Sequence, residues 1–368
     1  MLDAFPQWAD DLGPRQILLV REPRIRLEAI VVVDNVACGP ALGGVRMASD
    51  VTLEEVGRLA RAMTFKNAAA GLPHGGGKAG IRADPRSERP DKERLIRTFA
   101  RLIGDLRDYV PGPDMGTNEE CMAWIADEIG RVVGLPRVVG GIPLDEIGAT
   151  GLGLAVAAEV AAPEAGVSLD GARCAVQGFG AVGRHASRFL AERGAKLVAA
   201  SDSEGAVHRP EGLDIAALTA HKQRGASVGT FPGGRPLPRD ELIGVDCDIW
   251  IPAARPDVLT EDNVERLKAK LVLQGANIPA TDRAEEWMHA HGILSVPDFI
   301  ANAGGVICAS VEYHGGSESQ AMATIAEKIR ANTAEVLARA GAGSLLPRQA
   351  AIETARSRVA EAMSYRRS

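Results

Sequence analysis

The stretch ARCAVQGFGAVGRHASRFLAERGAKLVAASD, residues 172–202, decides the fold of one half of this chain. It predicts a strand, a tight turn built on Gly178, Gly180 and Gly183, a helix, and a second strand that ends beside Asp202. Such glycines let the backbone approach a pyrophosphate, and the positive end of the helix stabilises its charge. Asp202 lies 19 residues after Gly183, close to the ~20 expected for a carboxylate that binds a ribose. The stretch therefore predicts a dinucleotide site; a tight strand-to-helix turn without a ligand is the alternative.

The residue at the end of the second strand bears on which dinucleotide is bound. Asp202 favours NAD, because a carboxylate bonds both ribose hydroxyls and repels a 2′-phosphate. Ser201 is an alternative partner for the ribose, and His208 and Arg209 follow closely, so NADP is not excluded. The residues expected at the cofactor in this stretch are Gly178, Phe179, Gly180, Ala181, Val182, Gly183, Ser201 and Asp202.

Beyond this stretch, short apolar runs alternate with helical patterns, which is typical of a doubly wound parallel sheet. A loop-rich segment, residues 134–151, is the expected domain boundary. We therefore expect an α/β fold of two domains. The first covers residues 1–145, and the second, of Rossmann type, covers 146–334, with C-terminal helices of about 335–368 packing back on the first.

The first third of the chain mixes strand and helix patterns. Residues 28–37 are β-branched and predict a strand, and a helix is expected to begin at Thr52, which forms a capping box with Glu55. Two glycine-rich stretches, 39–47 and 66–81, are expected to be loops, the second ending in a short strand.

Composition excludes several classes of function. The 42 basic and 48 acidic residues give a net charge of −6, which argues against nucleic acid or an anionic membrane as the main partner. The five cysteines are scattered without a C-x-x-C pair, and the seven histidines fall in no metal spacing, so we expect no zinc site, disulfide scaffold or other metal. The N-terminus shows no signal peptide pattern, and no run of about 18 apolar residues occurs, so a cytoplasmic protein is expected.

A second motif, MTFKNAAAGLPHGGGKAGI (residues 63–81), resembles the signature of the glutamate/leucine/phenylalanine/valine dehydrogenase family. Blocks similar to those of the family follow the same order over nearly the whole chain: GPALGGVRM (39–47), GPDMGT (112–117), GFGAVG (178–183), QGANIPAT (274–281) and NAGGV (302–306). The resemblance implies NAD(P)-dependent oxidative deamination of an amino acid to a 2-oxo acid and ammonia. It also implies an N-terminal domain that binds substrate and builds a homo-oligomer, with dimer, hexamer and octamer all open.

The same resemblance implies roles for residues of the signature. Lys66 is expected to hold the α-carboxylate of the substrate, with a structural ion pair as its alternative role. Lys78 is expected to polarise the developing carbonyl and manage the proton of the attacking water, which needs a lysine whose pKa is lowered by burial. Asp114 is expected to move the proton of the amine, and Gly76 to allow close approach of the backbone to the substrate.

Three further residues match positions of the family near the ligands. Thr150 matches a threonine at the nicotinamide amide, Asn277 an asparagine at the nicotinamide ribose, and Asn302 one at the substrate carboxylate. From the residues alone, Thr150 is equally a helix cap and the asparagines are turn formers. His74 precedes the glycine run and is expected to be a solvated loop residue.

Two positions bear on which amino acid is deaminated. Members specific for glutamate carry a lysine where this chain has Leu42, and a serine where it has Ala309. Both residues are apolar here, and an unpaired carboxylate buried against them would cost several kcal/mol. We therefore expect an apolar L-amino acid of the leucine, valine or phenylalanine type. Two alternatives stay open: a glutamate dehydrogenase, which the blocks SDSEG, IPAARPDVLT and QGANIPAT resemble, and a non-catalytic dinucleotide-binding module.

Overall fold

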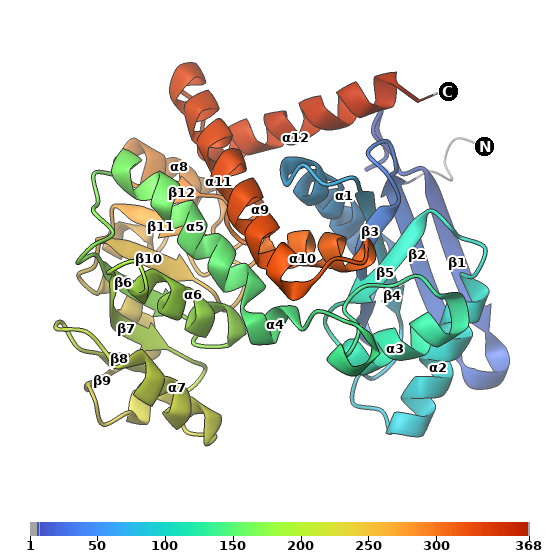
Figure 1. Cartoon of the computed structure of the whole chain (residues 1–368), viewed down its shortest axis with the longest axis horizontal. Helices are drawn as coiled ribbons and strands as arrows, with labels where there is room; N and C mark the ends of the chain where they lie inside the picture. Colours follow the sequence, from blue (N-terminus) through green and yellow to red (C-terminus); the bar gives the residue numbers. More distant parts are fainter. Residues whose placement is uncertain (1–5, 7, 367–368) are drawn as a thin grey trace. The chain divides into compact units, whose positions relative to one another are not determined.

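A computed structural model of the chain describes residue 6 and residues 8–366 (Figure 1). The chain divides into two compact units, which we call unit 1 and unit 2. Unit 1 consists of Met1–Pro143, Val306–Ala321 and Ile352–Ser368, and unit 2 of Leu144–Gly305 and Met322–Ala351. These bounds differ from the expected ones in the C-terminal third of the chain. The chain returns to unit 1 at Val306, leaves it at Met322 and enters it again at Ile352.

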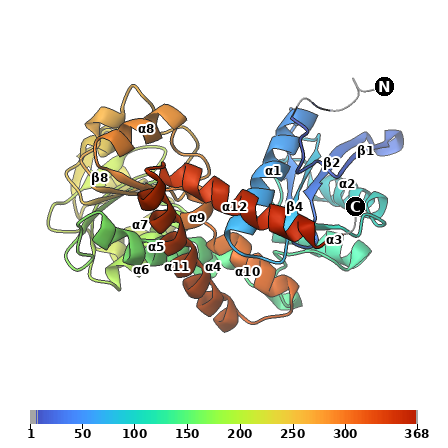
Figure 2. The same ribbon diagram turned by 90° about the horizontal axis from the view of Figure 1, so that it is seen from above.

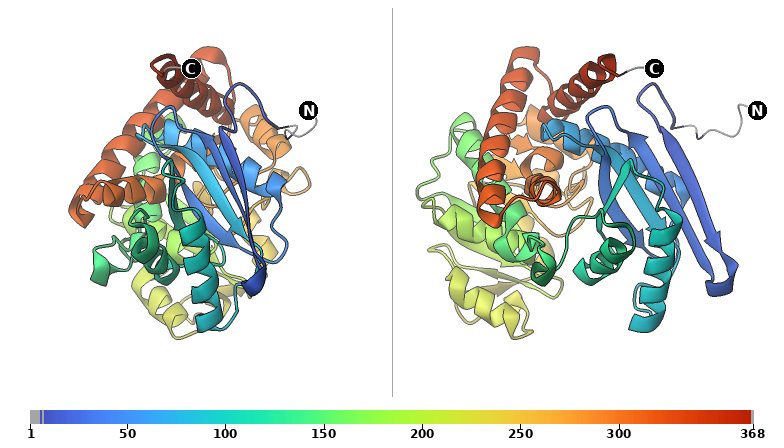
Figure 3. Two further views of the ribbon diagram at one scale, coloured as in Figure 1. Left: turned by 90° about the vertical axis from the view of Figure 1, so that its right-hand side faces the viewer. Right: turned by 45° about the vertical axis from the view of Figure 1, so that its right-hand side comes forward.

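Unit 1 is built on a five-stranded sheet in the order β1-β2-β4-β3-β5. Its strands are β1 (Gln16–Glu22), β2 (Leu27–Asn35), β3 (Ala41–Met47), β4 (Gly75–Ile81) and β5 (Tyr109–Pro113). β1 and β2 form an antiparallel hairpin, drawn in blue in Figure 3. β3 runs parallel to both β4 and β5, so the carboxyl ends of these three strands share one edge of the sheet.

Alternating side chains of the strands bury both faces of this sheet. On β2, Ile30 and Val32 face α1 (Leu53–Ala69), where Val56 and Ala60 cover them. Val31 and Val33 belong to the core of the opposite face, which α2 (Arg89–Leu102) and α3 (Glu119–Ile129) close (Figure 1). Thr52 caps α1, as predicted, because its hydroxyl accepts from the amide of Glu55 at 3.2 Å.

Both glycine-rich stretches contain a strand: the first contains β3, where we expected only a loop, and the second ends in β4, where a short strand was expected. All seven residues of β4 are buried, and β4 lies between β2 and β3. A Cβ atom on Gly76 would lie 2.0 Å from the amide nitrogen of Thr64 in α1, and one on Gly43 of β3 would lie 1.7 Å from the carbonyl oxygen of Gly77. The loop prediction for residues 39–47 was wrong because glycine is disfavoured in strands by local propensity, whereas here it lets neighbouring backbones pack closely.

Unit 2 is built on a seven-stranded sheet in the order β12-β11-β10-β6-β7-β8-β9. The five strands from β12 to β7 are parallel, and β8 and β9 are antiparallel additions. The strands are β6 (Arg173–Gln177), β7 (Lys196–Ser201), β8 (Ala206–His208), β9 (Arg235–Leu237), β10 (Ile249–Pro252), β11 (Leu271–Leu273) and β12 (Leu294–Val296). The order reverses between β6 and β10, which is where ligands bind in open parallel sheets.

The helices of unit 2 flank this sheet. They are α4 (Leu144–Ile147), α5 (Ala149–Glu164), α6 (Ala181–Ala191), α7 (Ile215–Gln223), α8 (Asp282–Ala290) and α9 (Asp298–Ala301). α5 and α6 lie side by side (Figure 1), and buried side chains around Trp250 and Met288 fill another core of the sheet. The predicted class, an α/β fold with a Rossmann-type domain, is confirmed.

Three C-terminal helices complete the chain: α10 (Gly304–Tyr313), α11 (Glu318–Gly343) and α12 (Pro347–Ser364). In unit 2, α11 lies beside α5, and Arg330 pairs with Glu159 (Figure 2). In unit 1, Arg358 of α12 donates to the carbonyl oxygen of Ala69 at the end of α1, at 2.8 Å. No helix among the described residues has the length and apolar character needed to cross a membrane.

Candidate active site and cofactor site

A buried ion pair lies at the carboxyl edge of the sheet of unit 1. Lys78 is the fourth residue of β4, and Asp114 follows directly after β5. The Nζ atom of Lys78 lies 2.9 Å from Oδ2 of Asp114, and the two side chains are only 8 % and 21 % exposed. The two residues predicted to be catalytic are thus in direct contact.

A third charged group joins this pair. Arg46, near the end of β3, donates from Nε to the same Oδ2 atom of Asp114 at 3.0 Å, and its Nη1 atom pairs with Glu55. Arg46 was not among the residues predicted for the site, although it lies in the block GPALGGVRM. The parallel pairing of β3 with β4 and β5 is the feature that could have pointed to Arg46, because it brings the ends of these three strands to one edge of the sheet.

The loop after β5 fixes the carboxylate of Asp114. The amide of Asp114 donates to the hydroxyl of Thr117 at 3.0 Å, and that hydroxyl donates to the carbonyl oxygen of Val45 at 2.7 Å. A Cβ atom on Gly44 would lie 2.7 Å from the Cβ of Asp114, so only glycine leaves room for this side chain above β3.

Both Lys78 and Asp114 have pKa values below their usual ones. Burial lowers the pKa of the Lys78 ammonium and outweighs the attraction of Asp114, while Arg46 lowers it further. Burial alone would raise the pKa of Asp114, but Lys78 and Arg46 outweigh it and hold that pKa below its usual value. The site therefore combines an ionised carboxylate with an amine that gives up its proton more readily than a solvated lysine.

The other substrate residues predicted in unit 1 lie on the face of the sheet that α1 covers. Lys66 is in the last turn of α1 and is half-buried. Gly76 lies in β4 against α1, so the lack of a side chain is needed for packing there. Leu42 of β3 and Ala309 of α10 are buried in one apolar cluster, and both are almost fully covered, at 3 % and 6 % exposed.

His74 differs from its predicted state. It is fully buried in the loop directly before β4, and its Nδ1 atom lies 3.2 Å from the carbonyl oxygen of Pro40. Its ring meets the rings of Tyr313 and His314 with centroids 5.4 Å apart in each case. Nε2 has no hydrogen-bond partner among the described residues, and burial lowers the pKa of His74 to about 4. The expectation of a solvated histidine was wrong. His74 does lie in the loop before β4, but Pro40, Tyr313 and His314 enclose its ring.

In unit 2, the three glycines of the fingerprint have three different environments. Gly178 has a φ of +99°, a conformation that favours glycine, and a Cβ atom on Gly183 would lie 2.0 Å from the carbonyl oxygen of Gly178. Gly180 is exposed, with no atom within 4 Å of the position a Cβ would take. Gly178 thus allows the tight turn, Gly183 allows the helix to pack closely on the strand, and Gly180 leaves the backbone open to a pyrophosphate. The next residues, Ala181 and Val182, open α6, whose N-terminus has no side-chain cap.

The residues after β7 form a polar turn. Ser201 ends β7 and is buried, and the carboxylate of Asp202 is only 6 % exposed. Its Oδ2 atom accepts from Nζ of Lys222 at 2.6 Å and from the amide of Val228 at 2.9 Å. Its Oδ1 atom accepts from the hydroxyl of Ser227 and from two backbone amides of its own turn at 3.0–3.1 Å. Both carboxylate oxygens of Asp202 thus already accept hydrogen bonds from the protein.

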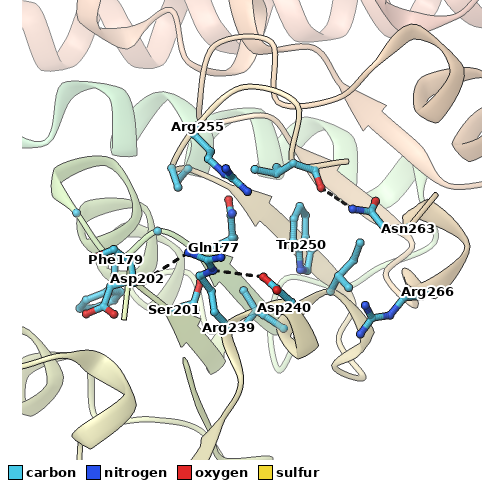
Figure 4. Close-up of a pocket in the computed structure, with 18 of the residues that line it drawn as sticks. Gln177, Phe179, Ser201, Asp202, Arg239, Asp240, Trp250, Arg255, Asn263 and Arg266 are labelled. Atoms are coloured by element: carbon cyan, nitrogen blue, oxygen red, sulfur yellow. Dashed lines mark hydrogen bonds and ion pairs between the residues drawn. The ribbon is translucent and has the colours of Figure 1, made fainter. Parts of the chain in front are cut away.

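A pocket lies between these elements at the switch point of the sheet (Figure 4). Gln177, Phe179 and Trp250 line it together with Ser201, Asp202 and Ser203. Four cationic side chains also line it, namely Lys222, Arg239, Arg255 and Arg266, against Asp202 and Asp240 as acidic ones. Its residues therefore fit a dinucleotide with a negatively charged phosphate portion.

The three remaining predicted residues lie in unit 2. Thr150 is in the first turn of α5, close to Gly305. Asn277 is exposed in the loop after β11, and its Oδ1 atom accepts from Nδ2 of Asn302 at 3.1 Å. Asn302 is buried, and its own Oδ1 atom has no partner among the described residues. The structure therefore places Asn302, expected at the substrate, beside the asparagine expected at the cofactor.

Comparison with known proteins identifies the family of both parts of the chain. Residues 140–367 match the Glutamate/Leucine/Phenylalanine/Valine dehydrogenase family, and residues 20–131 match the Glu/Leu/Phe/Val dehydrogenase dimerisation domain. The chain is similar to a glutamate dehydrogenase of Thermotoga maritima, with 42 % identity over 82 % of this chain and 77 % of the relative. A glutamate dehydrogenase of Aeropyrum pernix is 39 % identical over the same shares, and an NADP-specific glutamate dehydrogenase of Saccharolobus shibatae is 40 % identical over 76 % and 69 %.

Solved structures give the same result. A hetero-hexameric glutamate dehydrogenase of Thermus thermophilus, in a leucine-bound form, superposes with a TM-score of 0.85 at 30 % identity, covering 96 % of this chain and 90 % of that one. An L-tryptophan dehydrogenase of Nostoc punctiforme superposes with a TM-score of 0.75 at 26 % identity, covering 96 % and 97 %.

Fold, site and relatives together define an amino-acid dehydrogenase, an NAD(P)-dependent oxidoreductase that acts on CH–NH2 donors. The chain belongs to the Glutamate/Leucine/Phenylalanine/Valine dehydrogenase family.

The expectation of an apolar amino acid as substrate was wrong. Three relatives that match 76–82 % of the chain at 39–42 % identity are glutamate dehydrogenases. The expectation depended on Leu42 and Ala309, which the structure buries in one cluster with Val110 and Val133. Packing within unit 1 therefore gives a second explanation for their apolar character, besides a role at the substrate.

Proposed function

We propose that this protein is a glutamate dehydrogenase, which converts L-glutamate, water and NAD(P)+ to 2-oxoglutarate, ammonium, NAD(P)H and a proton. The observation that carries the proposal is the buried contact of Lys78 with Asp114, 2.9 Å long and backed by Arg46. A module that only binds a dinucleotide has no need of a desolvated lysine paired in this way, because burying both charges is costly. The glutamate dehydrogenases among the relatives support the choice of glutamate.

In this proposal each residue of unit 1 has a distinct task. Lys66 binds the α-carboxylate of glutamate by charge. Asp114, an ionised carboxylate, accepts a proton from the substrate ammonium, which leaves the amine lone pair free to form the imine. Lys78, with its lowered pKa, accepts a proton from the water that attacks the imine carbon, and then stabilises the oxygen that becomes the carbonyl. When bound, the nicotinamide ring supplies the acceptor for the hydride that leaves Cα.

We also propose a division of labour between the two units. Unit 1 carries the charged residues for the substrate. Unit 2 carries the dinucleotide fingerprint, with Thr150 and Asn277 for the cofactor, and contributes Asn302 at the substrate carboxylate. The match of residues 20–131 to a dimerisation domain supports a homo-oligomer built through unit 1.

Initial rates at 340 nm test the proposal. We expect kcat/KM for L-glutamate to exceed that for L-leucine and L-phenylalanine by at least about tenfold. Lys78→Met should lower kcat by about a thousandfold or more. The matched control is Lys92→Met, which removes a half-buried lysine of unit 1 that donates to the carbonyl oxygen of Pro85. Equal rates for Lys78→Met and Lys92→Met, or faster turnover of leucine than of glutamate, would overturn the proposal.

The cofactor that we propose is NADP(H). The reason for favouring NAD was a carboxylate at position 202 that binds the ribose and repels a 2′-phosphate. Here Lys222 neutralises Asp202, and every oxygen of that carboxylate already accepts hydrogen bonds from the protein. With Asp202 neutralised, the neighbouring Arg239 favours an added phosphate, as does the NADP-specific relative.

Equilibrium titration of nucleotide fluorescence tests this choice without turnover. We expect NADPH to bind at least about tenfold more tightly than NADH, with the difference shrinking as salt is raised because it depends on charge. Lys222→Gln should weaken NADPH binding more than NADH binding. Equal affinities for both nucleotides in the unaltered protein would show that NADP is not preferred.

A further inference from the structure

A network of buried charges joins α12 to the sheet of unit 2. Arg348, in the first turn of α12, has a side chain that is 16 % exposed. Its Nε atom donates to both oxygens of Glu285, at 2.8 and 2.9 Å, and its Nη2 atom donates to Oδ1 of Asp298 at 2.9 Å and to Oε1 of Gln274 at 2.8 Å. Every partner is buried, so the fork of the guanidinium fixes three side chains at once.

One of these partners holds the loop after β11. The second oxygen of Asp298, Oδ2, accepts from the amide of Ile278 at 2.9 Å. Ile278 has a φ of +48°, an unfavourable conformation for a β-branched residue, and its side chain is 51 % exposed. Its carbonyl oxygen accepts from the amide of Asp257 at 3.0 Å. The backbone of Ile278 is thus fixed on both sides in a conformation that its own side chain disfavours.

The residue before Ile278 is Asn277, which the proposed function assigns to the cofactor. Asn302 donates to Oδ1 of Asn277 and also approaches the carbonyl oxygens of Gly275 and Ala276 at 3.3 Å. The loop 275–278 therefore has two supports, Asn302 from one side and the Arg348–Asp298 pair from the other. It follows a strand of the parallel sheet at its carboxyl end, where such folds bind ligands.

We propose that Arg348 is a positioning residue for the cofactor: acting through Asp298, it holds Ile278 in its left-handed conformation and so sets the orientation of Asn277. Arg348 itself need not touch the nucleotide. The inference rests on the proposed function for the assignment of Asn277, whereas the support of the loop rests on the contacts of unit 2 alone. A simpler role, anchoring the start of α12, predicts no effect on the loop.

Two measurements on the full-length protein separate these roles. In the first, hydrogen–deuterium exchange is followed at the amide of Ile278 without nucleotide. Arg348→Lys keeps the charge but loses the fork, and it should speed this exchange by about tenfold or more. The matched control is Arg330→Lys, in which the altered residue also comes from a C-terminal helix and pairs with Glu159 in unit 2. Equal exchange at Ile278 in the two variants would overturn the support of the loop by Arg348.

The second measurement is the dissociation constant for NADPH. Arg348→Lys should raise it by about tenfold, and adding Ile278→Gly should restore it to within about threefold, because glycine adopts a positive φ without strain. Loss of an anchor for α12 would not be repaired by a change at Ile278. Faster exchange with unchanged affinity would refute the link to the cofactor. If the unaltered protein bound no nicotinamide nucleotide, the proposed function would fail, while the exchange experiment would still decide whether Arg348 supports the loop.

Discussion

His74, which is buried directly before β4, makes the stability of the protein depend on pH in a way that can be calculated. The Nδ1 atom of His74 faces the carbonyl oxygen of Pro40, which only accepts, so Nδ1 carries the proton and Nε2 is the bare nitrogen. Protonating Nε2 would place a charge and an unpartnered N–H in the interior. Burial therefore lowers the pKa of His74 to about 4, the bond to Pro40 opposes this shift, and the nearby His314 adds to it.

The sign and size of the effect follow from linkage. An unfolded histidine takes up a proton below about pH 6.5, whereas the folded one remains neutral down to about pH 4. Acid therefore favours the unfolded chain, and stability is lost as the pH falls from about 6.5 toward 4. At about pH 5 the loss is about 2 kcal/mol, and the limit at still lower pH is about 3 kcal/mol.

The perturbation that isolates this effect is His74→Phe, which keeps an aromatic ring beside Tyr313 and removes the titration. Denaturant unfolding at about pH 7 and at about pH 5, at equal protein concentration, gives the stability difference between the two proteins at each pH. We expect that difference to shift by about 2 kcal/mol in favour of the variant at the lower pH. His289→Gln, at an exposed histidine of α8, is the control and should leave the pH dependence unchanged. A shift below about 0.5 kcal/mol for His74→Phe would show that the folded histidine titrates normally.

Three further predictions concern the two sites. Lys78→Met should abolish turnover while the dissociation constant for NADPH stays within about twofold, because the fingerprint lies in the other unit; weaker nucleotide binding would contradict this. Gly183→Ala should weaken NADPH binding by about tenfold or more and lower the melting temperature, since its Cβ would lie 2.0 Å from the oxygen of Gly178. Leu42→Lys should lower the free energy of unfolding by about 3 kcal/mol, because position 42 is 3 % exposed among apolar side chains; a variant as stable as the parent would show that Leu42 lines an open pocket.

The dinucleotide-binding half of the fold was predictable because its signals are local. A strand, three glycines, a helix and an acid follow one another within residues 172–202. Gly178 adopts its positive φ and Gly183 its close contact within that same segment. The cap at Thr52 is equally local, because its hydroxyl bonds an amide three residues away. Interactions of this range depend on neighbours in the chain, so the order of residues specifies them.

The candidate active site was predictable only in part. Lys78 and Asp114 could be named from motifs, but their contact joins residues 36 positions apart and depends on the pairing of β3 with β4 and β5. Arg46 was missed because its role comes only from reaching the same carboxylate oxygen. Residues 39–47 were predicted to be a loop, because the close approach of β3 to β4 that requires glycine at position 43 is not visible in the local pattern.

The amino-acid sequence by itself determined the fold class, the family and the identity of the charged pair, since each depends on residue types at short spacings. Only the tertiary structure decided what surrounds those residues. In the folded chain, donors from residues 204–228 form hydrogen bonds to both carboxylate oxygens of Asp202. Leu42 and Ala309 are buried in one apolar cluster, and His74 is buried as well. The physical reason is that burial, pKa and hydrogen-bond saturation are set by atoms brought together through the fold, and their distance along the chain does not reveal them.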